Sequence, residues 1–166
     1  DVLASGGGDV VRVDGDITPI ANTMARLRRE STQYDIILMD HSSGISKSAE
    51  VMAHASDTVL LVLVPELTSI SDSYGLFKQL RKTDAALDCR LVVNRAETAS
   101  EAEFIHNKLC AVTERFLGSM PVYLGHVVED RQVRESVAGQ TAVTRVAPES
   151  QVAQELTSLA QALARI

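Results

Sequence analysis

Short, uninterrupted apolar runs recur along the chain, and most are followed by a stretch with helical spacing. They predict strands at 10–13, 35–40, 58–64, 91–93 and 122–128. Runs that are both short and apolar throughout are typical of strands buried on both faces of a sheet. Strands that alternate with helices favour right-handed crossovers and a parallel arrangement. We therefore expect an α/β fold with a doubly wound, mostly parallel sheet, in one domain over residues 1–166.

Polar capping residues and helix-starting prolines predict where the helices begin. In chain order these residues are Pro19, Ser46 (for a helix over about 47–55), Thr68 or Ser69, Ser100, Asp130 and Ser150. Residues 138–149 contain a Gly and a Pro and are expected to form a loop.

The predicted helix after the strand at 91–93 has the most complete set of start and stop signals. Ser100 and Glu103 have the spacing of a capping box, and Gly118 is expected to end the helix. Apolar residues at spacings of three and four predict the face that packs on the sheet; they are Ala102, Ile105, Leu109, Val112 and Phe116.

Composition and charge argue against several kinds of partner and site. The net charge of −6 argues against a nucleic-acid partner. Cys89 and Cys110 lack the spacing of a zinc site or a disulfide framework, which fits a reducing cytoplasm. The last helix has an apolar stripe but a single basic residue, Arg165, so we expect a core helix rather than a membrane-surface helix. A peripheral position at the inner membrane face is left open.

Polar residues follow the predicted strands at their carboxyl ends, where open parallel sheets bind ligands. Asp40 ends the strand at 35–40, Asn94 and Arg95 follow 91–93, and Glu129 and Asp130 follow 122–128. A carboxylate at such a tip can hold Mg²⁺, and an Asn side chain can pair with an adenine edge. The alternatives are ordinary strand-end turns for Asp40 and Asn94 and a surface ion pair for Arg95.

Taken together, these segments resemble the MinD/ParA-type P-loop ATPases, and within them the FlhG (FleN) group of flagellar-number regulators. The residues that carry the resemblance are YDIILMDHSSGIS, PELTSISDSYGLFKQL, VVNRAETASEAE and YLGHVVEDRQVRESV. The sequence departs from the family at His41, Leu67 and Val128, which replace a usual Thr and two prolines.

The resemblance implies a role for each matching residue. Asp40 would hold the Mg²⁺ shell, through water, and Ser43 and Gly44 of switch II would sense the γ-phosphate. Asn94 and Arg95 would contact adenine, with Glu129 and Asp130 in the loop beside the base. These implied contacts define an ATP or ADP site with Mg²⁺.

The Walker A loop of that family is not found in these residues. The glycine run at 6–8 is not followed by GK[ST], and the first lysine is Lys47. We expect either a fragment of a longer chain or a protein that has lost its catalytic half, and favour the fragment. The 166 residues alone should therefore be inactive as an ATPase and hold no nucleotide tightly. In the family the P-loop strand lies beside the strand ending in Asp40, so its loss should expose strand edges at 35–40 and 58–64.

The implied function is an ATP-dependent switch that sets the number or placement of flagella. The implied partners are a second copy in a homodimer, an FlhF-like flagellar GTPase, C-ring proteins or a flagellar transcription regulator. A non-catalytic interaction module and a ParA-like partition ATPase are the alternative hypotheses; the net charge of −6 weighs against the second.

Overall fold

A computed structural model describes residues 18–41 and 44–166. The predicted strand at 10–13 lies outside these residues. The elements in chain order are α1 (Thr18–Glu30), η1 (Ser31–Gln33), α2 (Lys47–His54), β1 (Thr58–Leu63), α3 (Leu67–Thr83), β2 (Asp88–Ala96), α4 (Ala99–Leu117), β3 (Val122–Val128), α5 (Arg131–Ala138), α6 (Val143–Val146) and α7 (Gln151–Leu163).

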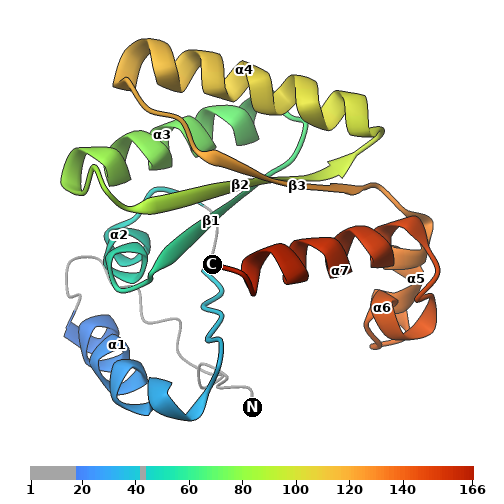
Figure 1. The fold of residues 1–166 in the computed structure, drawn as a ribbon, viewed down its shortest axis with the longest axis horizontal. Coiled ribbons are helices and arrows are strands. Elements are labelled where there is room, and N and C mark those ends of the chain that lie inside the picture. The colour runs from blue at the N-terminus through green and yellow to red at the C-terminus, as the bar shows by residue number, and fades with distance from the viewer. Residues whose placement is uncertain (1–17, 42–43) are drawn as a thin grey trace.

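The three strands form one parallel sheet in the order β1-β2-β3. Helices α3 and α4 cover one face, and α7 covers the other (Figure 1). The predicted α/β fold with a parallel sheet flanked by helices is therefore confirmed for the described residues.

The core on the α3/α4 side is mainly aliphatic, with Phe77 buried inside it and Tyr74 and Tyr123 packed against it. Leu63, Leu91 and Val93 of the sheet meet Phe77 of α3 and Leu109 of α4, and each is at most 1% exposed. The smaller core under α7 is centred on Val92, Val127 and Val152. Because both faces of β2 are covered, its run of apolar residues is buried throughout, as expected for a central parallel strand.

The segment 35–40 is the main correction to the sequence-based fold. It forms no strand, and its side chains are largely exposed: Ile36 is 57% and Leu38 83% exposed. An apolar run becomes a strand only where a neighbouring strand takes up its backbone hydrogen bonds. Within the described residues no strand pairs with 35–40, so the prediction of a strand buried on both faces is wrong here.

Local signals placed several helix ends correctly. Ser46, Asp130 and Ser150 cap α2, α5 and α7 through their side-chain oxygens, and Gly118 ends α4 in the left-handed conformation. The first turn of α3 was predicted less well, because its N-cap is Glu66 and the Ser69 hydroxyl accepts a hydrogen bond from the Val64 N–H instead.

Three further predictions are wrong. The N-cap of α4 is Thr98, two residues before the predicted Ser100. Its hydroxyl accepts from the Glu101 N–H, and the Glu101 side chain accepts from the Glu97 N–H. Val112 and Phe116 are 38% and 63% exposed, because this end of α4 turns its buried side to Cys110 and Thr113. The predicted loop at 138–149 also contains the short helix α6.

Candidate functional site

The carboxyl ends of β1, β2 and β3 lie at one edge of the sheet, because all three strands run in parallel. This edge carries Glu66 after β1, Asn94 and Arg95 at the end of β2, and Glu129 with Asp130 after β3. The structure thus brings together four of the predicted site residues.

Arg95 and Glu129 form the contact that joins two of these tips. The Arg95 Nε donates to Glu129 Oε2 at 2.7 Å, and the Glu129 N–H donates to the Ala96 carbonyl at 2.8 Å. This hydrogen bond lowers the pKa of the Glu129 carboxyl and raises the pKa of the Arg95 guanidinium. Arg95 has a φ of 58° and lies at a register shift in the pairing of β2 with β3, between Asn94 and Ala96. This local irregularity turns the Arg95 side chain toward β3.

Asn94 and Asp130 use part of their polar groups locally. The Asn94 Oδ1 accepts a hydrogen bond from the Arg95 N–H at 3.0 Å, and the Asp130 Oδ1 accepts one from the Gln132 N–H at 2.7 Å. Asp130 therefore acts as the N-cap of α5. The amide group of Asn94 is a donor at Nδ2 and has a second lone pair at Oδ1, which is the chemistry that a base edge requires.

Asp40 lines a cavity together with Thr68 and Ser69, which lie in the first turn of α3 just after β1. Asp40 is exposed, in the segment 35–40 that forms no strand. Ser43 lies outside the described residues, and Gly44 has a φ of 109°. Within the described residues no three His, Cys, Asp or Glu side chains are grouped closely enough to hold a metal ion. Mg²⁺ is usually held by one or two carboxylates together with waters and substrate phosphates, so the role of Asp40 stays a prediction.

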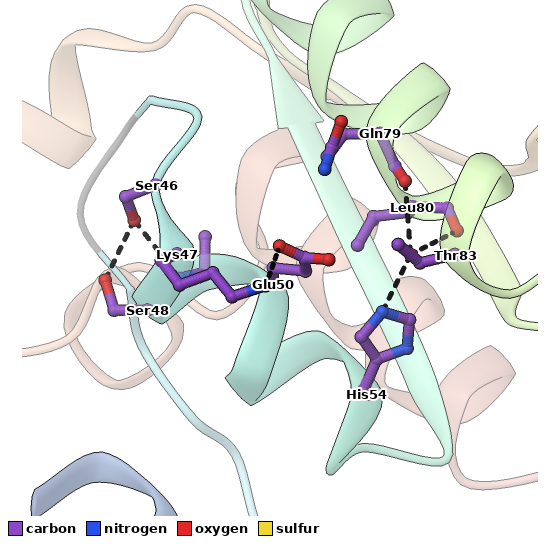
Figure 2. A network of polar contacts seen from close by, with 9 residues as sticks. Ser46, Lys47, Ser48, Glu50, His54, Gln79, Leu80 and Thr83 are labelled. Atoms are coloured by element: carbon purple, nitrogen blue, oxygen red, sulfur yellow. Dashed lines mark hydrogen bonds and ion pairs between the residues drawn. The ribbon is translucent and has the colours of Figure 1, made fainter. Parts of the chain in front are cut away.

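Helix α2 follows Asp40 in the chain, and polar contacts hold it in place (Figure 2). The Ser46 hydroxyl accepts from the Ala49 N–H, and His41 Nε2 lies 3.0 Å from Ser48 Oγ. Lys47 donates to Glu50 at 2.8 Å, which lowers the pKa of the Glu50 carboxyl. The end of α2 is joined to α3 by His54 Nε2, which lies 2.8 Å from Thr83 Oγ1.

A cleft of about 1390 Å³ separates the segment 35–40 from β1. Its lining includes Ile37, Leu60, Val62, Thr68 and Asp72. The wall on the β1 side is apolar and partly exposed, with Val62 55% exposed. The cleft lies along the free edge of the sheet and is separate from the contact between Arg95 and Glu129.

Sequence reasoning missed Glu155, whose Oε2 accepts a hydrogen bond from the Val128 N–H at 2.8 Å. No local pattern marks this residue, because its partner lies 27 positions away. No helix in the described ranges has the length and apolar character needed to cross a membrane.

Comparisons with known proteins agree with this architecture. The family model described as cellulose biosynthesis protein BcsQ matches residues 7–163. The antiactivator FleN of Pseudomonas aeruginosa is 34% identical over 131 residues, which cover 79% of this chain and 47% of FleN. The flagellum site-determining protein YlxH of Helicobacter pylori is 25% identical over 127 residues, 76% of this chain and 42% of YlxH.

Among solved structures, the septum site-determining protein MinD of Pyrococcus horikoshii, in complex with Mg-ADP, superimposes with a TM-score of 0.68. It is 22% identical and covers 89% of this chain and 56% of its own chain. The likeness shows that the fold is of the MinD/ParA type. The chain spans less than half of either curated relative.

Proposed function

The chain belongs to the family of the cellulose biosynthesis protein BcsQ and is of MinD/ParA type, and on this premise we propose that it forms part of an ATP-binding switch protein. The switch regulates the number or placement of flagella. The name of one relative, a flagellum site-determining protein, supports this role, and the name of another, an antiactivator, is that of a regulator. In the proposal residues 1–166 form a single domain of that protein.

The observation that carries the proposal is the meeting of the β2 and β3 tips. Arg95 and Glu129 are joined at 2.7 Å, and Asn94 and Asp130 are their direct neighbours. We assign Asn94 and Arg95 to the adenine base and the loop at Glu129 and Asp130 to its flank. Asp40, Ser43 and Gly44 are proposed to face the phosphates and Mg²⁺, although the lone Asp40 carboxylate supports no step of hydrolysis.

The test is isothermal titration of the full-length gene product with Mg-ATP. We expect Asn94→Ala to raise the Kd for Mg-ATP about tenfold, because the loss of one net hydrogen bond in a bound complex corresponds to roughly that factor. Asn107→Ala, an exposed Asn on α4, is the matched control and should leave the Kd unchanged. Equal affinities of the wild type and Asn94→Ala would remove Asn94 from the site.

A non-catalytic interaction module is the competing function, and one observation favours it. Asp40 is exposed and has no grouped metal ligands among the described residues. For the 166-residue polypeptide alone we expect no binding of Mg-ATP at micromolar concentrations. If the full-length gene product also fails to bind Mg-ATP, the interaction module is the correct reading.

The flagellar role and its partners need a test in cells. We expect deletion of the gene to change the number or position of flagella counted by electron microscopy, and Asn94→Ala to reproduce that change. The proposed partners are a second copy of the chain, an FlhF-like GTPase, C-ring proteins or a transcription regulator. A deletion strain with normal flagella would contradict the flagellar role while leaving nucleotide binding intact.

A further inference from the structure

Glu155 of α7 reaches the outer edge of β3. Among the described strands β3 pairs only with β2, so its outer backbone groups have no strand partner. Val128, the last residue of β3, is 9% exposed, and its N–H donates to Glu155 Oε2 at 2.8 Å. A buried backbone N–H without a partner is strongly disfavoured, so this carboxylate replaces the missing strand at one position.

The Glu155 carboxylate is held in this orientation by two more groups. Gln151 Nε2 donates to Glu155 Oε1 at 2.9 Å, and His126 Nε2 lies 3.5 Å from the same oxygen. His126 is itself contacted at Nδ1 by the Tyr123 hydroxyl, at 3.2 Å. The side chain of Glu155 is only 15% exposed. A carboxylate accepts hydrogen bonds more strongly than a neutral group, and partial burial limits the competition from water.

Val128 lies directly before the loop that carries Glu129 and Asp130. The Glu129 N–H is bonded to the Ala96 carbonyl of β2, and the Glu129 side chain is bonded to Arg95. The two consecutive backbone N–H groups at 128 and 129 are thus held from opposite sides, by α7 and by β2. A change at Glu155 would therefore release one of the two anchors of the loop.

We propose that Glu155 is a positioning residue that fixes the loop at Glu129 and Asp130 through the Val128 N–H, and so couples α7 to the base-contacting part of the site. The physical basis of this inference is the hydrogen bond between Glu155 and Val128. Its effect on base contact rests on the proposed nucleotide function.

The first experiment measures the amide hydrogen exchange of residues 128–130 in the full-length gene product. Glu155→Ala removes the acceptor and should accelerate exchange at Val128 about tenfold, the factor expected for one lost hydrogen bond. Glu155→Gln keeps a carbonyl acceptor without charge and should give a smaller increase. Glu149→Gln removes the same charge from an exposed residue just before α7 and should change nothing.

If the rates of amide hydrogen exchange at residues 128–130 are unchanged in both Glu155 variants, Glu155 does not hold the loop and the proposal is overturned. If Glu155→Ala fails to fold, Glu155→Gln alone decides, because it retains the shape of the side chain. An acceleration in Glu149→Gln equal to that in Glu155→Gln would also overturn the proposal, since the effect would then be one of net charge.

The second experiment separates positioning of the base from a general loss of structure. We expect the ratio of the Kd values for Mg-GDP and Mg-ADP to fall at least threefold in Glu155→Gln, because a looser loop discriminates less between bases. Equal weakening of both nucleotides would mean that Glu155 has only a structural role. If the wild type binds neither nucleotide, the proposed function fails, and the exchange rates still decide whether Glu155 holds the loop.

Discussion

Gly125 is constrained both by its own backbone conformation and by the packing of α7 against it. It has a φ of 153° and sits at the register shift opposite Leu91 and Val92, so the strand is irregular there. A Cβ added at this position would lie 2.9 Å from Leu159 Cδ2 of α7. The backbone conformation is one that side-chain-bearing residues rarely adopt, and α7 leaves little room beside it.

We expect Gly125→Ala to lower the free energy of unfolding by about 1–2 kcal/mol, mainly through backbone strain, since the Leu159 side chain can move aside. Urea unfolding followed by circular dichroism measures this change. Gly139→Ala is the matched control, because Gly139 has a φ of −83° and its nearest atoms lie at 3.5 and 3.6 Å. A loss of stability as large in Gly139→Ala would show that backbone strain at Gly125 is not the cause.

At the scale of the element, α4 illustrates how two overlapping capping signals are resolved. The sequence offers Thr98 with Glu101 and Ser100 with Glu103. The structure uses the first: Thr98 Oγ1 accepts from the Glu101 N–H at 3.1 Å, and Glu101 Oε2 accepts from the Glu97 N–H at 2.7 Å. Because β2 continues to Ala96, only two residues separate the strand from the first residue of the helix.

We expect Thr98→Ala to lower the free energy of unfolding by about 1 kcal/mol, the usual effect of losing an N-cap side chain. Ser100→Ala should change it by less than about 0.3 kcal/mol, because an exposed residue inside the first turn loses little. Both values come from the same urea titration. The reverse order of the two effects would restore the pair Ser100 and Glu103 as the cap.

At the scale of the whole molecule, the β1 edge of the described sheet is only partly covered. Leu60 and Val62 are 38% and 55% exposed, and they face the cleft that also contacts the apolar segment 35–40. Exposed apolar strand edges favour pairing with other chains, because their backbone groups and side chains are both unsatisfied.

We expect the 166-residue polypeptide alone to self-associate as its concentration is raised, and Val62→Lys to reduce this association. A lysine on an edge strand opposes pairing through its charge and hydration. Val137→Lys, at a 71% exposed position on α5, is the control for a general effect of charge. Light scattering measures the outcome, and a monodisperse monomer at high concentration for the wild type would contradict the expectation.

Much of the fold could be predicted from local sequence. The runs at β1, β2 and β3 are apolar over most of their length, and the caps Ser46, Asp130 and Ser150 act on backbone groups two or three residues away. These features depend on interactions within a few residues, so the residue types alone determine them. The grouping of Asn94 with Glu129 followed from one further inference, that the strands are parallel.

The tertiary structure decided the contacts between elements that are far apart in the sequence. The ion pair between Arg95 and Glu129 joins residues 34 positions apart, and the bond from Val128 to Glu155 spans 27 positions. The segment 35–40 has the residues of a strand, but no described strand lies beside it to complete its hydrogen bonds. An apolar run or a carboxylate specifies only what it can bind, whereas the packing of the chain determines whether a partner is within reach.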